Sequence, residues 1–340
     1  MRLKLRCVSY RGRGVFGVRS FRSGFAENIQ SFIAFREASG VWNDIGYGTN
    51  IELFDHFCAD HFPVGTPLCQ EMVDMWCQKR DTEKNYSRNA RIRVVIAFIK
   101  YLRERGLTAV EEPVLLKSEP SSYVPHAFTE DELKRFFIAC DEIPVNNSCK
   151  SKIYHITCPV FFRLLYSSGI RTTEARLLKC TDFDPVHGVL RIQRSKGPDQ
   201  HYVALHETMT SLMIQYDNAI RILQPQRTYF FESPKGEHYG KEWVTNTFNT
   251  IWKKANCSAE KATPYQLRHH YAVANINRWN SCDEFEFCDR LLFLSKSMGH
   301  RAIESTLHYY SLVPRLADTI LEKTETGFNS IVPEVQYEEE

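Results

Sequence analysis

An aperiodic stretch over residues 111–126 constrains the fold of this chain more than any other feature. It holds three prolines and shows neither a helical nor a strand period, which is typical of an interdomain linker. The chain has 340 residues, whereas a single hydrophobic core stops growing at about 250–300 residues. We therefore predict one domain over residues 26–110 and a second over residues 127–313.

Residues 26–110 show helical periodicity and no strand signal of comparable strength. In the longest pattern, Val94, Ile99 and Leu102 recur on one side of a helix. We therefore predict an all-helical first domain, with helices over residues 27–36, 50–61, 69–80 and 85–106.

Residues 127–313 combine helices with a short antiparallel pair of strands. Two apolar runs, residues 188–193 and 201–205, are separated by turn residues, which predicts a hairpin. Thr129 followed by Glu132 predicts a capping box at the start of a helix that ends at Cys140. Further helices are predicted over residues 157–168, 172–178, 207–222, 241–255, 264–279, 285–298 and 303–313. The predicted fold class is mainly α (α+β), with a small antiparallel sheet in the second domain.

Charge is concentrated at the two ends of the chain. The net charge is +2, but residues 1–23 carry seven basic side chains and no acidic one, and residues 321–340 carry six glutamates against one lysine. We assign residues 1–25 to a basic N-terminal segment. The rest of the chain then has no net charge, so any DNA affinity must arise from local clusters of basic residues. Two solvated tails would fit these charges equally well.

Composition excludes several classes of protein. No apolar run reaches the roughly 18 residues that a membrane span needs, and the N-terminus lacks the pattern of a secretory signal. The 11 cysteines form no Cys-x-x-Cys pair, and a chain of this size does not depend on disulfides. We expect reduced thiols in a cytoplasmic protein that has no membrane partner.

Two basic residues of the second domain occupy the ends of predicted elements. Arg171 precedes Glu174 by three residues, so the carboxylate can hold the guanidinium on one helical face. The alternative is an ordinary surface ion pair. Lys196 lies at the tip of the predicted hairpin, a position at which a lone lysine is usually only solvated.

Two further motifs lie at predicted helix ends. Thr263 and a following proline start a helix, so Tyr265 and Arg268 lie near an N-terminus that favours anions. A glycine ends the next helix just before His300, and the helix after that carries Tyr309. Each motif is weak alone, but their order and separation together form a specific pattern.

These motifs resemble the signature of tyrosine recombinases of the phage-integrase type. That signature is an arginine, a hairpin lysine, a His-x-x-Arg box, a Gly-His pair and a tyrosine nucleophile. The matching residues are Arg171, Lys196, Arg268, His300 and Tyr309, the last standing nine residues beyond His300. The resemblance covers about residues 26–323, and it identifies residues 26–110 with the core-binding domain and residues 127–313 with the catalytic domain.

The resemblance implies phosphoryl transfer without a metal or another cofactor. Two guanidiniums clamp phosphate oxygens, the Tyr309 hydroxyl attacks phosphorus to form a 3′-phosphotyrosyl link, and Lys196 protonates the departing 5′ oxygen. His300 either donates to a phosphate oxygen or orients the nucleophile. Supporting roles fall to Glu174, His201 and His269.

The sequence departs from the family pattern at two places. The usual histidine of the His-x-x-Arg box is Tyr265 here, so we assign this residue to hydrogen-bond stabilisation and not to base catalysis. The stretch between Arg268 and His300 is also longer than the family pattern, and residues 280–289 are the extra segment.

The resemblance also implies partners. These are double-stranded DNA recombination sites, a homo-tetramer assembled on DNA, and accessory proteins as further candidates. Residues 314–340 would supply a protomer-docking helix and an acidic tail, and the alternative is a helix that folds back on its own domain. The reaction would serve integration or excision of a mobile element or phage. The predicted DNA contacts in the first domain are Arg88, Arg91, Arg93 and Lys100.

Several alternatives remain open at the level of sequence. His56, Cys58 and His61 could suggest a metal site, although a closed set of four ligands is missing. Tyr310 is the rival nucleophile. A catalytically weak DNA-binding relative and a type IB topoisomerase are the two alternative functions.

Overall fold

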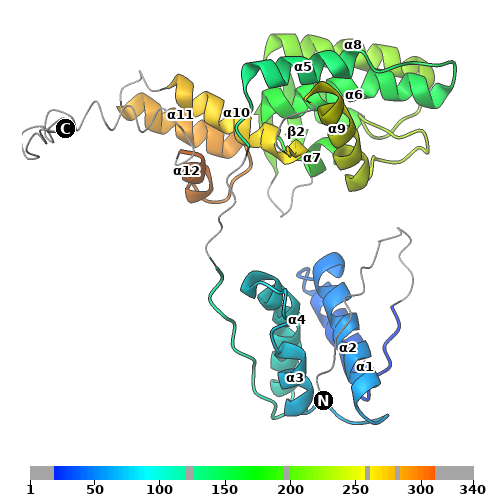
Figure 1. Ribbon diagram of the computed structural model, residues 1–340, viewed down its shortest axis with the longest axis vertical. Helices are drawn as coiled ribbons and strands as arrows, with labels where there is room; N and C mark the ends of the chain where they lie inside the picture. Colours follow the sequence, from blue (N-terminus) through cyan, green and yellow to red (C-terminus); the bar gives the residue numbers. More distant parts are fainter. Residues whose placement is uncertain (1–18, 120–125, 194–199, 257–260, 280–283, 311–340) are drawn as a thin grey trace, which may run out of the picture. The chain divides into compact units, whose positions relative to one another are not determined.

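The computed structural model describes residues 19–119, 126–193, 200–256, 261–279 and 284–310. It divides into two compact units, Met1–Tyr123 and Val124–Glu340 (Figure 1). The division falls within the stretch predicted to be a linker. The predicted docking segment, residues 314–340, lies outside the described residues.

The first unit is built from four α-helices and one short π-helix. These are α1 (Ala26–Ala38), η1 (Asp44–Gly48), α2 (Thr49–His61), α3 (Gln70–Cys77) and α4 (Asn85–Arg103). The predicted helices are confirmed, although α3 ends at Cys77 and α4 at Arg103, each three residues before its predicted end. Helix α4 forms the centre of the core, where Ile92, Val95 and Phe98 are fully buried against side chains of the other helices.

The residues that follow α4 bind to the first unit and do not act as a free linker. Asn89 of α4 donates to the Leu116 carbonyl at 2.6 Å and accepts from the Leu116 amide at 3.1 Å. Asn85 donates to the Lys117 carbonyl at 2.9 Å. We call residues 110–119 the strap. The prediction of a linker from residue 111 is wrong for the strap, because an extended segment held by side-chain amides has no sequence period.

The second unit contains eight α-helices among its described residues. These are α5 (Glu130–Asp141), α6 (Cys149–Ser168), α7 (Thr172–Leu177), α8 (Glu207–Leu223), α9 (Lys241–Ala255), α10 (Pro264–Arg278), α11 (Glu284–Ser297) and α12 (Glu304–Tyr310). The predicted capping box at Thr129 is present. Helix α6 lies at the centre of the unit (Figure 1) and packs against α5, α8 and α10. In the core, Phe162 of α6 packs against Phe136 of α5 and Phe248 of α9.

A three-stranded antiparallel sheet lies beside these helices. Its order is β1 (Phe183–Asp184), β2 (Val189–Ile192) and β3 (His201–Ala204). Strands β2 and β3 form the predicted hairpin, whose tip, residues 194–199, lies outside the described residues. Strand β1 has only two residues and was not predicted. Helix η2 (Cys180–Asp182), a 3₁₀ turn, precedes β1.

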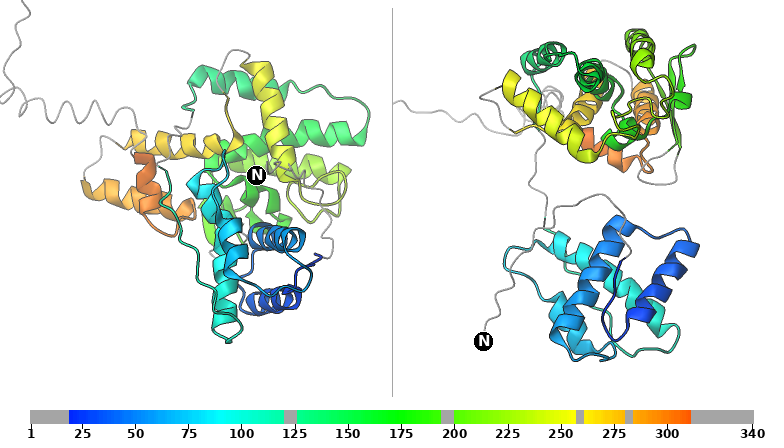
Figure 2. Two further views of the ribbon diagram at one scale, coloured as in Figure 1. Left: turned by 60° about the horizontal axis from the view of Figure 1, so that its bottom comes forward. Right: turned by 90° about the vertical axis from the view of Figure 1, so that its right-hand side faces the viewer.

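Helices α10, α11 and α12 lie together on one side of the second unit (yellow to orange in Figure 2). They share a small core of their own, which includes Ile276, Leu294, Met298 and Tyr309. Because α10 also packs on α6, this core holds the chain around residues 298–309 against the end of α6. Residues 280–289, the predicted extra segment, include the start of α11.

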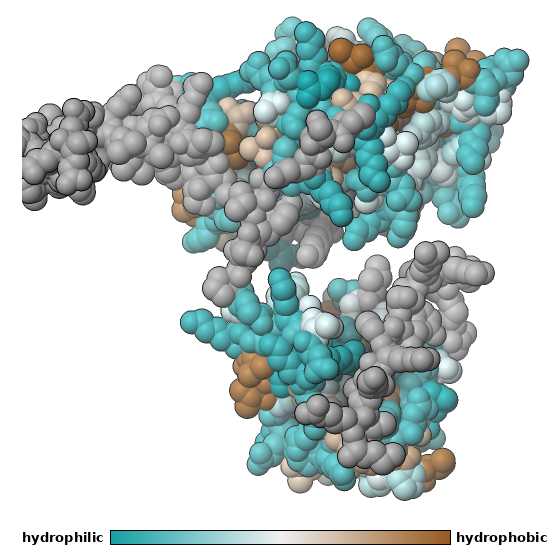
Figure 3. Space-filling view, viewed as in Figure 1, coloured by the Kyte–Doolittle hydropathy of each residue, from teal (hydrophilic) through white to brown (hydrophobic). Residues whose placement is uncertain are grey.

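The visible surface of both units is mainly hydrophilic, with separate apolar side chains between the polar ones (Figure 3). Among the described residues, no helix has the length and apolar character that crossing a membrane requires.

Candidate active site

Two glycines in left-handed conformation end the helices that frame the site. Gly169 caps α6 with φ of 64°, and Gly299 follows α11 with the same φ. A side chain would be strained at either position. It would also have no room, because a Cβ on Gly169 would lie 2.3 Å from the Tyr271 ring and one on Gly299 would lie 2.5 Å from the His201 ring.

Arg268 joins the two glycine-ended loops. Its Nη1 donates to the Gly169 carbonyl at 2.6 Å, and its Nη2 donates to the Met298 carbonyl at 2.7 Å. Both carbonyls lie at helix C-termini, where the partial negative charge favours a cation. The side chain is 1% exposed, and burial together with Arg171 lowers its pKa. A guanidinium stays charged in proteins even so.

Arg171 is the N-cap of α7, and its side chain also holds segments of the site together. Its Nη1 donates to Glu174 Oε1 at 2.6 Å and its amide donates to Oε2 at 2.8 Å. Its Nη2 donates to the Gly299 carbonyl at 2.9 Å. The Glu174 side chain is 0% exposed and that of Arg171 is 21% exposed. The predicted pair therefore forms, and it is not an ordinary surface pair.

His300 contacts both Arg268 and α12. Its Nε2 lies 2.9 Å from Arg268 Nη2, and its Nδ1 lies 2.7 Å from Thr306 Oγ1. Burial is the main reason that the pKa of His300 falls to about 4, and the charges of Arg268 and Arg171 act in the same direction. His300 is therefore neutral at physiological pH.

Tyr309 lies inside the site with its ring almost covered. It is 3% exposed, its ring stacks on His300 with centroids 5.9 Å apart, and the His269 ring centroid lies 5.2 Å away. Burial raises the pKa of Tyr309, while the nearby Arg268 acts to lower it. The Tyr309 phenol is thus protonated, and it lies close to the guanidinium of Arg268, which is buried more deeply than that of Arg171.

Tyr265 covers this site from the N-terminus of α10. Its side chain is 45% exposed, and its ring lies 4.9 Å from His269 in an edge-on arrangement. A hydrogen-bonding interaction between Tyr265 and Tyr309 acts to raise the pKa of Tyr309. The pKa of His269 falls to about 4, first through burial and then through His308 and Arg268.

The structure thus brings together most of the predicted site residues. Eight of them meet around the ends of α6 and α11: Arg171, Glu174, His201, Tyr265, Arg268, His269, His300 and Tyr309. Lys196 lies outside the described residues, although β2 and β3, which flank it, are present. Sequence reasoning missed Thr306, whose only signal was a hydroxyl six residues after His300.

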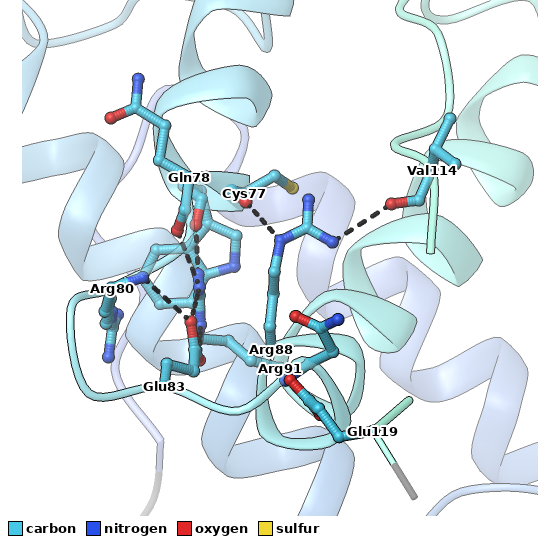
Figure 4. Close-up of polar contacts among 10 residues, drawn as sticks. Cys77, Gln78, Arg80, Glu83, Arg88, Arg91, Val114 and Glu119 are labelled. Atoms are coloured by element: carbon cyan, nitrogen blue, oxygen red, sulfur yellow. Dashed lines mark hydrogen bonds and ion pairs between the residues drawn. The ribbon is translucent and has the colours of Figure 1, made fainter. Parts of the chain in front are cut away.

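Two of the predicted DNA contacts are wrong, because the first unit buries both side chains (Figure 4). Arg88 is 9% exposed and donates to the carbonyls of Cys77 and Val114. Arg91 is 6% exposed, forms an ion pair with Glu83 at 2.8 Å and donates to the Trp76 carbonyl. These guanidiniums fasten α4 to its neighbours, so neither is available to a phosphate.

The other two predicted contacts, Arg93 and Lys100, are exposed on α4. Lys100 lies 3.4 Å from Glu112 of the strap. In the basic N-terminal segment, Arg19 is held by Asp44 at 2.8 Å and by Glu52 at 2.7 Å. That guanidinium therefore has a structural role.

The possible metal site at His56, Cys58 and His61 does not form. His56 Nε2 bonds the Ser20 carbonyl and His61 Nδ1 bonds the Phe57 carbonyl. Cys58 is 1% exposed. Within the described parts of the chain, no three His, Cys, Asp or Glu side chains are grouped to hold a metal ion.

Known proteins resemble this chain along most of its length. Residues 126–314 match the model of the Phage integrase family. A putative integrase/recombinase y4rB of Sinorhizobium fredii is 25% identical over 89% of this chain and 98% of its own length.

Two solved structures share the fold. One is the XerH site-specific recombinase bound to a palindromic difH substrate in a post-cleavage complex, with a TM-score of 0.60, 16% identity and coverage of 87% of this chain and 84% of that one. The other is a lambda integrase tetramer bound to a Holliday junction, with a TM-score of 0.58, 14% identity and coverage of 83% and 76%.

Proposed function

This chain is a tyrosine recombinase of the phage integrase family, and from that membership we propose that it cleaves and rejoins DNA strands at specific sites through a 3′-phosphotyrosyl intermediate. The observation that carries the proposal is that the Tyr309 ring stacks on His300, whose Nε2 lies 2.9 Å from Arg268 Nη2, within the site that Arg171 also lines. Two permanent positive charges beside a phenol suit an attack on a phosphodiester.

The proposed step is an in-line displacement at phosphorus. The Tyr309 oxygen bonds to phosphorus as the bond to the 5′ oxygen breaks, so the number of phosphate esters is unchanged. The phenolic proton passes to solvent water, and Lys196 gives a proton to the departing 5′ oxygen, so protons balance over the step. Attack by the 5′ hydroxyl of another strand reverses the step and joins that strand.

Arg171 and Arg268 stabilise the charge that spreads over the non-bridging oxygens. Arg268 is held by two carbonyls and Arg171 by Glu174 and the Gly299 carbonyl. Guanidiniums fixed in this way need little reorganisation during the reaction. We propose that they take the part that a divalent ion plays in other phosphoryl-transfer enzymes.

His300 fits an orienting role better than a donating one. Its Nε2 is already engaged with Arg268, and its ring stacks on the nucleophile.

Tyr309 is itself 3% exposed and Tyr265 is 45% exposed. We therefore propose that the phosphate enters past Tyr265, whose hydroxyl then donates to a phosphate oxygen.

The proposed partners are double-stranded recombination sites and three further copies of this chain. The lambda integrase neighbour is a tetramer on a Holliday junction, which supports the same assembly here. Residues 314–340 would dock one protomer on the next. Arg93 and Lys100 are the proposed phosphate contacts of the first unit. The proposed biological role is integration or excision of a mobile element or phage. Accessory proteins are further candidate partners.

A nicked suicide DNA substrate in excess EDTA tests the chemistry. We expect the parent chain and Tyr310→Phe to form a covalent protein–DNA complex, and Tyr309→Phe to form none. Mass spectrometry of the phosphotyrosyl peptide should place the link on Tyr309.

Three outcomes would contradict the proposal. A link on Tyr310 would overturn the choice of nucleophile. Binding without any covalent complex would favour a DNA-binding relative, and relaxation of supercoils by single chains without strand exchange would favour a type IB topoisomerase.

A further inference from the structure

We infer that Thr306 is a positioning residue, whose hydroxyl fixes the tautomer of His300 and through it the orientation of Arg268. The inference rests on the proposed function only for its effect on rate. Thr306 lies in the first turn of α12 and is fully buried, and its Oγ1 lies 2.7 Å from His300 Nδ1.

The first step concerns the other nitrogen of the ring. His300 Nε2 lies 2.9 Å from Arg268 Nη2. A guanidinium has donors and no acceptor, so Nε2 must be the acceptor in this hydrogen bond. It therefore carries a lone pair and no proton.

The second step follows from the chemistry of imidazole. A neutral ring carries one proton, which must then lie on Nδ1. The Nδ1–H faces Thr306 Oγ1, so the hydroxyl oxygen accepts this hydrogen bond. Thr306 thereby stabilises the tautomer that leaves Nε2 free to accept from Arg268.

The charged groups around His300 also disfavour a second proton on its ring. Arg268 from α10 and Arg171 from α7 raise the cost of a second proton, and His201 from β3 does so too, whereas Glu174 opposes them. The ring of Tyr309 from α12 stacks on the imidazole. A proton on Nε2 would point at the protons of Arg268, and the two groups would separate.

Loss of the hydroxyl should therefore act on the arginine that binds the phosphate. In Thr306→Val the buried Nδ1–H would lose its acceptor, and the ring would favour the tautomer with the proton on Nε2. We expect cleavage of the suicide substrate to slow roughly ten- to thirtyfold, the effect of losing one hydrogen bond to a charged site. Thr306→Ser keeps a hydroxyl and should restore most of the rate. The neighbouring Ser305 is exposed, so Ser305→Ala is the matched control and should match the parent.

The tautomer can be read without any assay of activity. Long-range ¹H–¹⁵N spectra of the full chain with labelled histidine should show His300 protonated on Nδ1, with His300→Gln identifying its signals. Thr306→Ser should keep this pattern and Thr306→Val should move the proton to Nε2.

The spectrum of the parent chain is decisive even if Thr306→Val does not fold. A proton on Nε2 in the parent would overturn the inference, and so would a Thr306→Val chain that keeps both the Nδ1 proton and the parental rate. If the tautomers behave as expected while no chain cleaves DNA, the proposed function fails and the role of Thr306 stands.

Discussion

Tyr265 is the residue at which this site departs from the family pattern, and its surroundings define what it does there. Its hydroxyl interacts with Tyr309, the proposed nucleophile, in the direction that raises the pKa of Tyr309. It therefore does not help to remove the phenolic proton in the free chain. Its exposure leaves it available to donate to a phosphate that enters the site.

Tyr265→Phe should slow single-turnover cleavage about ten- to thirtyfold, because one hydrogen bond to a charged group contributes about 1.5–2 kcal/mol to the transition state. The parent should show no titration of His269 or His300 between pH 5.5 and 9, because the pKa values of these two residues lie at about 4. Tyr265→His should keep activity and add a rise in rate with pH near 6.5, since an imidazole accepts a proton only when neutral. A Tyr265→Phe chain as inactive as Tyr309→Phe would show that this role is wrong.

The identities of the site residues could be predicted from sequence because their spacing along the chain is specific. Arg171, Arg268, His300 and Tyr309 all lie where the motifs placed them. The burial of Arg88 and Arg91 could not be predicted, because only the fold brings the Cys77 and Trp76 carbonyls and the Glu83 carboxylate to these guanidiniums. Thr306 was missed for the same reason, since only the fold brings its hydroxyl to His300.

At the scale of elements, the strap shows how an extended segment becomes part of a helical unit. Asn89 is 4% exposed and exchanges two hydrogen bonds with Leu116. Sequence predicted the helices well because helical burial has a period of 3.6 residues. The predicted start of α6, residue 157, is eight residues too late, because the helix begins at Cys149. Pro159 inside the helix weakens the local signal, and packing in the core overrides it.

Asn89→Ala should release the strap from α4. Both hydrogen bonds to Leu116 would be lost, and we expect the free energy of unfolding of the first unit to fall by about 1–3 kcal/mol. The Leu116 amide should also lose protection in hydrogen exchange. Ser87 is exposed on the same helix, so Ser87→Ala is the control. Unchanged protection of Leu116 in Asn89→Ala would mean that other contacts hold the strap.

At the scale of the whole molecule, the two units have separate hydrophobic cores. The proposed function assigns DNA binding to the first unit and catalysis to the second. The core of the first unit is built around Phe54 and Phe98, and the main core of the second unit around Phe136 and Phe161. We therefore expect residues 124–340 to fold without the first unit. The near-neutral net charge of +2 gives no strong overall attraction to DNA, so affinity must come from local phosphate contacts, and the proposed function places such contacts on both units.

This division predicts how DNA binding depends on salt. Each phosphate contact releases counterions and steepens the fall of log K with log salt by about 0.9. The full chain should therefore show a steeper slope than residues 124–340 alone, and its affinity should be higher because the second contact becomes intramolecular. Arg93→Gln and Lys100→Gln should each reduce the slope of the full chain by about 1, whereas Ser87→Ala should leave it unchanged. Binding measured by fluorescence anisotropy from about 50 to 200 mM salt would give these slopes. Equal slopes for the full chain and residues 124–340 would show that the first unit makes no phosphate contacts, and would remove Arg93 and Lys100 from the DNA interface.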